Sequence, residues 1–246
     1  MALNDEFVAQ GNWLFRWRSY LPFTFVVLVG IAYTQFAWPF HSEFLHNIWE
    51  FVCLAISFFG LLVRMLTHGH TPARTSGRNT SRQVARQLNT AGMYSVVRHP
   101  LYLGNFLIGL GILLLLWVWW LPVIYTLAFW VYYERIMFAE EAFLEEKFGK
   151  EFTDWSAVTP AFWPKLSRWR QPELGFSWRK VLGREYTGLI VVVLGHTGIE
   201  FFEHIMVHHR LGWKPFWIVF SIGGTIAYLV LRELKRKTTL LDVPGR

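Results

Sequence analysis

Two short stretches of this chain combine cationic, acidic, aromatic and glycine residues in an order that could form one chemical site. They read Arg98-His99-Pro100-Leu101-Tyr102-Leu103-Gly104 and, further along the chain, Glu140-Glu141 followed by Leu144 and Phe148-Gly149. Arg98 and His99 can donate to an anion, and Pro100 suits the first turn of a helix, where backbone N–H groups also attract anions. Glu140 and Glu141 supply the opposite charge. The pattern predicts a site that holds a ligand with both cationic and anionic groups.

The two stretches lie at opposite ends of a predicted hairpin of two apolar segments, residues 101–118 and 121–138. The tight turn between them, Trp119-Trp120-Leu121-Pro122, returns the chain to the face from which it started, so both stretches should meet there. Residues 139–155 are expected to form one cytoplasmic helix with Gly149 inside it. Because adjacent helical residues point about 100° apart, only one of Glu140 and Glu141 should face a ligand, and we favour Glu141.

The composition predicts a protein made of membrane-spanning helices. Hydrophobic residues make up 53% of the chain and charged residues only 17%. Apolar runs near twenty residues are long enough to cross a bilayer as helices, which satisfy their own backbone polar groups. We expect an all-α polytopic membrane helix bundle that forms one domain, residues 1–246. Six spans are predicted, at about 21–40, 46–66, 101–118, 121–138, 187–206 and 214–232.

The placement of the basic residues predicts the orientation. Of the 24 Lys and Arg residues, all except Arg210 and Lys214 lie on one side of the predicted spans. Positive residues favour the cytoplasmic side, so both termini and both long loops should be cytoplasmic, in a cytoplasmic or inner membrane. Six spans also require the termini to share a side. Since this charge flanks membrane segments, it does not indicate nucleic-acid binding.

Together the two stretches, flanked by spans, resemble the isoprenylcysteine carboxyl methyltransferase and phospholipid methyltransferase family over about residues 50–165. The resemblance implies an integral membrane enzyme that transfers a methyl group from S-adenosylmethionine to a lipid or lipid-linked acceptor. It implies that Arg98 and Glu141 are catalytic. It also implies a cofactor pocket lined by Arg98, His99, Tyr102, Gly104, Gly109, Gly111, Glu140 and Glu141. The three glycines have an alternative role in close helix packing.

The chain departs from the family pattern in two places. Phe152 and Trp155 stand where the family usually has tyrosines, so the aromatic rings are kept and the hydroxyl groups are lost. The last two predicted spans, within residues 187–232, lie outside the resemblance, and their role is not implied by it.

The loop that precedes the first stretch predicts an anionic acceptor group, a phosphate or carboxylate. Residues 64–98 contain six Arg and no Asp or Glu. Arg binds phosphate and carboxylate through two parallel hydrogen bonds, and we expect Arg74, Arg78 and Arg82 to bind the substrate. The general preference for positive charge on the cytoplasmic side would also load this loop with cations.

The fifth predicted span carries ionisable residues on one helical face: His196, Glu200, Glu203, His204 and His208. Such groups are costly in a membrane and usually face a protein interior. Imidazole and carboxylate can bind zinc or iron, but a single helix seldom supplies a full set of ligands. We therefore expect a polar interior seam and no metal.

Two other function classes remain open. A membrane reductase of the sterol-reductase type has a similar arrangement of motifs and uses NADPH. A non-enzymatic helix bundle with a polar seam, such as a transporter, would also fit the fifth span.

Overall fold

The structure is a computed structural model that describes residues 3–17, 20, 24–36, 38, 41–72, 75 and 85–245. Within these residues the chain is helical and contains no β-strand, which confirms the all-α prediction for this part of the chain. The α-helices are α1 (Leu3–Trp17), α2 (Thr24–Tyr33), α3 (Glu43–His70), α4 (Met93–Val96), α5 (Pro100–Leu114), α6 (Trp120–Phe148), α7 (Lys150–Ser156), α8 (Trp178–His208) and α9 (Pro215–Lys237), and η3 (Leu166–Arg168) is a short 3-10 helix.

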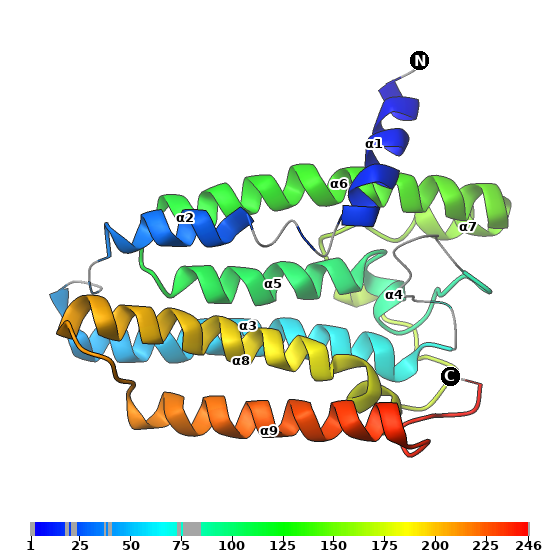
Figure 1. The fold of residues 1–246 in the computed structure, drawn as a ribbon. Coiled ribbons are helices and arrows are strands. Elements are labelled where there is room, and N and C mark those ends of the chain that lie inside the picture. Colours follow the sequence, from blue (N-terminus) through cyan, green and yellow to red (C-terminus); the bar gives the residue numbers. More distant parts are fainter. Residues whose placement is uncertain are drawn as a thin grey trace.

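The long helices lie side by side in a bundle, with α4, α7 and the C-terminal residues at one end and the α8–α9 connection at the other (Figure 1). Several helices begin where the sequence favours a start. Ser42 and Ser177 precede α3 and α8, and each hydroxyl accepts a hydrogen bond from a backbone N–H of the first turn. Pro100 and Pro215 occupy the first turns of α5 and α9, where the missing N–H is harmless.

α3 and α5 are antiparallel and pack unusually closely through glycines. A Cβ atom on Gly60 would lie 2.6 Å from the carbonyl oxygen of Gly104. One on Gly111 would lie 2.5 Å from the carbonyl oxygen of Cys53, near the opposite end of α5. Only glycine permits such backbone contact at membrane-helix interfaces. These contacts fix α5, and therefore the first turn that carries the motif, against the middle of the bundle.

α6 is held against α5 by aromatic side chains. The rings of Phe106 and Tyr125 stack with centroids 5.7 Å apart, and the Tyr125 hydroxyl donates to the carbonyl oxygen of Phe106. On the outer side of α6, α1 packs through Gly11, and the Tyr132 hydroxyl donates to the carbonyl oxygen of Leu14. The predicted hairpin is thus present, and it brings the C-terminal half of α6 alongside the first turn of α5.

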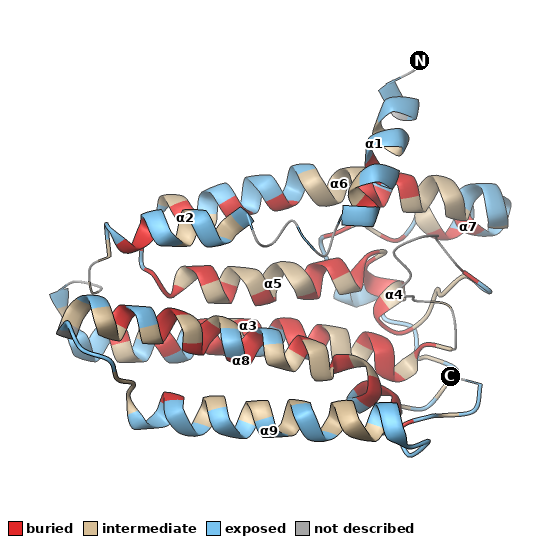
Figure 2. Cartoon of the chain, in the orientation of Figure 1, coloured by how far each residue is buried: buried red, intermediate tan, exposed pale blue. Residues whose placement is uncertain are grey.

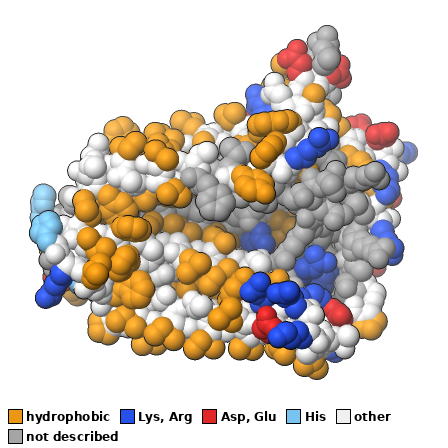
Figure 3. Space-filling model, in the orientation of Figure 1, with side chains coloured by type: hydrophobic (Ala, Val, Ile, Leu, Met, Phe, Trp, Pro, Cys, Tyr) orange, Lys and Arg blue, Asp and Glu red, His pale blue; other side chains and the backbone are white. Residues whose placement is uncertain are grey.

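Three described helices are long and apolar enough to cross a membrane: α3, α8 over Trp178–Val207, and α9. α2 and α5 are apolar but shorter. Much of the outer surface is apolar, α9 above all, while Lys and Arg gather mainly at the end with α4 and α7 (Figures 2 and 3). These features identify an integral membrane protein. The count of about six spans and the orientation remain predictions.

Several predicted boundaries need correction. α5 ends at Leu114 and α6 begins at Trp120, so the hairpin connection lies at residues 115–119 and not at the predicted turn Trp119-Trp120-Leu121-Pro122. α8 begins at Trp178, before the predicted start near residue 187.

α2 ends at Tyr33, well before residue 40, because the chain turns at Thr34 and Gln35; residues 21–23, 37, 39 and 40 of that predicted span lie outside the described residues. The predicted helix 139–155 is also wrong in its limits. α6 runs without a break from Trp120 to Phe148 and ends at Gly149, whose φ of 51° suits glycine, and α7 then begins a new direction.

Candidate functional site

The structure brings the two motif stretches into direct contact. His99 Nε2 lies 2.8 Å from Glu141 Oε1, and His99 Nδ1 lies 3.6 Å from Glu140 Oε2. Arg98 Nε lies 3.1 Å from the same oxygen of Glu141. The Tyr102 hydroxyl donates to Glu140 Oε1 at 2.6 Å. The site therefore joins the loop before α5, the first turn of α5 and the C-terminal half of α6.

Both glutamates take part, although only one was expected to face the site. The imidazole of His99 has nitrogens on two sides of its ring, so it reaches Glu141 with one and Glu140 with the other. The Tyr102 hydroxyl adds a second contact to Glu140. Glu140 and Glu141 point in directions about 100° apart on α6. Both still take part, because His99 contacts each of them and Tyr102 contacts Glu140.

Backbone hydrogen bonds hold the Arg98 segment in place. The N–H groups of Arg98 and His99 donate to the carbonyl oxygens of Pro160 and Ala161, at 2.9 and 3.2 Å. The Arg98 guanidinium also donates to the carbonyl oxygen of Ser156 at the end of α7. The loop after α7 therefore holds the backbone of the Arg98 segment, while the side chains of the motif contact α6.

Charge and burial set the protonation of His99. Burial lowers the pKa of His99, but the contacts with Glu140 and Glu141 outweigh burial and raise this pKa above its ordinary value. With His99 protonated, two cations face two carboxylates. Burial, with a smaller contribution from the negative charge of Glu140, also raises the pKa of the nearby Tyr94 hydroxyl, which stays neutral. Glu140 and Glu141 each keep a quarter of their side-chain surface exposed, so a ligand can reach them.

The three predicted glycines contact protein atoms. Gly104 and Gly111 face α3, where Arg64 and Ser57 lie against them. Gly109 faces the Tyr125 hydroxyl on α6, 2.2 Å from the position of a Cβ. These contacts favour the helix-packing alternative for all three glycines.

The predicted substrate residues Arg74, Arg78 and Arg82 lie outside the described residues. Phe152 and Trp155, which replace the usual tyrosines, are both buried in α7. The Trp155 indole N–H donates to the carbonyl oxygen of Tyr94, so this position still supplies a hydrogen-bond donor.

A polar cleft of about 770 Å³ lies at the same end of the bundle. Its lining comes from the segment before Arg98, from α7 and from the loop that carries η3, and it includes Ser95, Trp155, Lys165 and Arg170. This volume is in the range of small-molecule sites. None of Arg98, His99, Glu140 and Glu141 lines the cleft.

A buried ionic group next to the site was not predicted as functional. Arg64 on α3 makes two contacts with Glu185 on α8, at 2.8 and 3.1 Å, and also donates to Asn105 on α5. His68 Nε2 lies 3.1 Å from Glu185. Arg64 and Glu185 lie near the ends of two predicted spans on the same side as the motif stretches, but no local pattern in the sequence pairs them. The group ties α3, α5 and α8 together behind Gly104.

The polar face of the fifth predicted span lies in α8 and points inward. His196, Glu200 and Glu203 are all at least 95% buried, which confirms the interior placement for these three. His196 contacts the Ser57 hydroxyl on α3 at 2.9 Å. His204 lies against Gly212, and the side chain of His208 lies outside the described residues. Glu200 and Glu203 meet His46 and Glu50, at the end of α3 away from the motif site.

Comparison with known proteins supports the resemblance of the two motif stretches to membrane methyltransferases. Residues 74–151 match the family model described as phospholipid methyltransferase. The chain is 36% identical over 132 residues to a nickel-cobalt-cadmium resistance protein of Alcaligenes xylosoxydans xylosoxydans, covering 51% of this chain and 58% of that protein. It is 39% identical over 83 residues to a cobalt-zinc-cadmium resistance protein of Cupriavidus metallidurans, covering 34% and 38%.

A third relative is a protein-S-isoprenylcysteine O-methyltransferase of Schizosaccharomyces pombe, 30% identical over 97 residues, covering 37% of this chain and 41% of that protein. The chain thus spans between 38% and 58% of the length of these curated relatives. No solved structure matches the chain. The matched residues 74–151 contain both motif stretches and the hairpin between them.

Proposed function

We propose that this chain, whose residues 74–151 match the phospholipid methyltransferase family model and which resembles an isoprenylcysteine O-methyltransferase, is a membrane methyltransferase that uses S-adenosylmethionine. The single observation that carries the proposal is the contact of His99 with both Glu140 and Glu141. It unites the two motif stretches in one partly exposed, charge-balanced site. The acceptor is a lipid or lipid-linked group within the bilayer.

The side chains at the site fit this cofactor by their chemistry. S-adenosylmethionine presents a carboxylate, an ammonium, a sulfonium and a ribose, and when bound it supplies the methyl group. Arg98 suits the carboxylate, and Glu140 and Glu141 suit the ammonium or the ribose hydroxyls. His99 and Tyr102 hold the two carboxylates in place, as supporting hydrogen bonds do in preorganised sites.

For an anionic acceptor, the work of the protein is orientation and exclusion of water. A phosphate or carboxylate is already nucleophilic and needs no general base. Arg98 and Glu141 are then catalytic through positioning. Arg74, Arg78 and Arg82, in the loop just before the motif, bind the acceptor headgroup in this proposal. The site faces the cytoplasm, on the side with most of the basic residues.

The names of two relatives associate those proteins with resistance to divalent metals. We propose that this chain also contributes to metal resistance. Methylation of a lipid or lipid-linked group would change the binding of divalent metal ions to the membrane. The proposed chemistry remains methyl transfer.

Titration of the purified protein with S-adenosylmethionine and with NADPH, followed by a transfer assay with radiolabelled methyl donor and lipid extract, tests the proposal. We expect binding of S-adenosylmethionine alone and label in the lipid fraction. NADPH binding with reduction of a lipid would instead indicate the reductase class, and binding of neither would favour a non-enzymatic bundle.

The nature of the acceptor has its own test. Replacing Arg74, Arg78 and Arg82 with Gln should reduce turnover and leave cofactor affinity unchanged, because the proposal assigns these residues to the acceptor and not to the cofactor. Methylation of the amine of phosphatidylethanolamine, with no methylation of a phosphate or carboxylate group in any lipid, would refute the anionic acceptor while leaving the methyltransferase proposal intact.

A further inference from the structure

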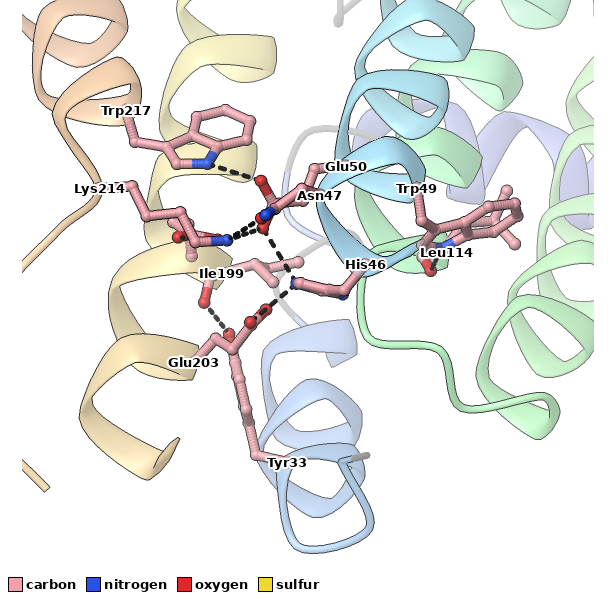
Figure 4. A network of polar contacts seen from close by, with 11 residues as sticks. Tyr33, His46, Asn47, Trp49, Glu50, Leu114, Ile199, Glu203, Lys214 and Trp217 are labelled. Carbon is pink, nitrogen blue, oxygen red and sulfur yellow. Dashed lines mark hydrogen bonds and ion pairs between the residues drawn. The ribbon is translucent and has the colours of Figure 1, made fainter. Parts of the chain in front are cut away.

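A second cluster of ionisable side chains lies at the opposite end of α3 and α8 from the motif site (Figures 1 and 4). It combines His46 and Glu50 from α3 with Glu200 and Glu203 from α8. One nitrogen or oxygen atom from each of the four residues can be chosen so that all four lie within 4.8 Å of one another. In a tetrahedral shell with bonds of about 2.1 Å, the ligand atoms lie about 3.4 Å apart. Side-chain shifts of about 1 Å would therefore close a coordination shell around one ion.

The two helices present these residues with regular spacing. His46 and Glu50 are one turn apart on α3, and Glu200 and Glu203 are neighbours on one face of α8. The α3–α8 contact brings the two pairs together. The expectation that no metal binds here rested on a single helix seldom supplying a complete ligand set, and α3 supplies the second half.

His46 points into the cluster, and its ring nitrogens make no hydrogen bond to the described residues. Its side chain is fully buried. Nε2 lies 3.0 Å from Glu50 Oε1 and 2.8 Å from Glu203 Oε1 (Figure 4), at ion-pair distance but without a hydrogen bond. A metal ion between this nitrogen and the two carboxylates would give the buried nitrogen the partner that it lacks as a hydrogen-bonding group.

The cluster contains more carboxylates than permanently charged cations. Glu50, Glu200 and Glu203 are each at least 95% buried. The cation that contacts them among the described residues, apart from His46, is Lys214, which pairs with Glu50 and lies 3.5 Å from Glu200. The Trp217 indole also donates to Glu50. With His46 neutral and all three carboxylates ionised, one ammonium leaves a deficit of two positive charges, and buried charge of one sign is strongly unfavourable.

We propose that His46, Glu50, Glu200 and Glu203 bind one divalent transition-metal ion of the zinc, cobalt or iron type. The ion supplies the two missing positive charges with His46 neutral, as an imidazole ligand must be. One nitrogen and three carboxylate oxygens suit these borderline ions better than copper(I), which prefers sulfur. Lys214 stays as the partner of Glu50 beside the ion. The site is independent of the proposed cofactor site, because the two lie at opposite ends of α3.

Elemental analysis of the purified protein tests the proposal directly. After removal of bound metal with chelator, the full-length wild type is incubated with Zn²⁺ or Co²⁺ and freed of excess ion. We expect close to one ion per chain, and an unfolding temperature that rises when the ion is restored. Co²⁺ should also give the visible absorption of a nitrogen- and oxygen-ligated site.

The variants Glu200→Gln and His46→Asn keep similar shape and remove one ligand each, and we expect metal affinity at least roughly tenfold weaker in both. Glu233→Gln, which changes a partly exposed glutamate on α9 that pairs with Lys237, is the matched control and should bind like the wild type.

A wild type that takes up neither ion and shows no change in unfolding temperature would overturn the proposal, whether or not the variants fold. It would also show that protons balance the cluster. Equal uptake by the wild type and both variants would overturn it as well. Neither result depends on methyl transfer or on S-adenosylmethionine, so failure of the metal-site proposal and failure of the proposed function can be distinguished.

Discussion

His99 Nε2 lies 2.8 Å from Glu141 Oε1, which makes the imidazole the link between the loop before α5 and the C-terminal half of α6. Each residue belongs to one of the two motif stretches, and the hairpin of α5 and α6 separates them in sequence. The contact explains why the histidine and the paired glutamates occur together: each carboxylate favours the charged imidazole, and the imidazole fixes each carboxylate.

The protonation of His99 gives a prediction for pH. Because Glu140 and Glu141 raise the pKa of His99, the protonated ring stabilises the folded state fully below its unfolded pKa of about 6.5. This stabilisation is lost as the pH rises through the higher pKa of the folded state. Glu141→Gln removes one carboxylate, so the loss should occur at lower pH. Unfolding temperature measured from mildly acidic to alkaline pH checks this.

Glu145→Gln is the control for that measurement, since Glu145 is exposed on the same helix. Its profile should match the wild type. Identical profiles for Glu141→Gln and the wild type would mean that Glu141 does not set the protonation of His99.

Tyr102→Phe tests the second carboxylate. The change removes the hydroxyl that donates to Glu140 at 2.6 Å and keeps the ring that packs on Tyr133. Losing a hydrogen bond to a charged group costs about 1.5–3 kcal/mol, so S-adenosylmethionine affinity should fall roughly tenfold or more. Tyr132→Phe, which removes the hydrogen bond to the backbone of α1, should bind normally. Equal affinities for the two variants would exclude Tyr102 from the site.

The glycines of α5 should act through packing. Gly111→Ala places a methyl group 2.5 Å from the carbonyl oxygen of Cys53 and should destabilise the protein by about 1–3 kcal/mol. Gly198→Ala on α8 meets no atom within 4 Å and should be neutral or stabilising by up to about 1 kcal/mol. Thermal unfolding in detergent compares them. If Gly111→Ala unfolds like the wild type but loses cofactor affinity, Gly111 belongs to the cofactor site after all.

The orientation is tested by cysteine labelling in sealed cells, with Cys53 changed to Ala. Arg78→Cys and Arg170→Cys should resist an impermeant reagent added outside, because both loops are predicted to be cytoplasmic. Arg210→Cys, in the α8–α9 connection, should be labelled and serves as the positive control. Efficient labelling at 78 or 170 would contradict the predicted cytoplasmic location of that loop.

The motif site could be predicted from sequence because its parts are local. Arg98, His99 and Tyr102 lie within one turn of a helix start, and a single hairpin returns the chain to Glu140 and Glu141. The hydrophobic pattern marks that hairpin without knowledge of the other helices.

The partners of the remaining polar residues could not be predicted, because they depend on how distant helices pack. Glu200 and Glu203 were visible as an inward face of α8, but nothing local pairs them with His46 and Glu50 on α3. The same holds for Arg64 and Glu185. The end of α6 at Gly149 was not predicted, because the apolar periodicity continues beyond it. The positive φ of Gly149, which ends the helix, leaves no mark on that periodicity.

The most direct test of the central claim is equilibrium binding of S-adenosylmethionine to the purified wild type and to four variants: Arg98→Ala, His99→Ala, Tyr102→Ala and Glu141→Ala. Each variant is first shown to be folded by its thermal unfolding, and Glu145→Ala is the matched control. Our account predicts saturable binding by the wild type and Glu145→Ala, and affinity at least roughly tenfold lower in all four variants. Unchanged affinity in the four variants, or no binding of S-adenosylmethionine by the wild type, would contradict it.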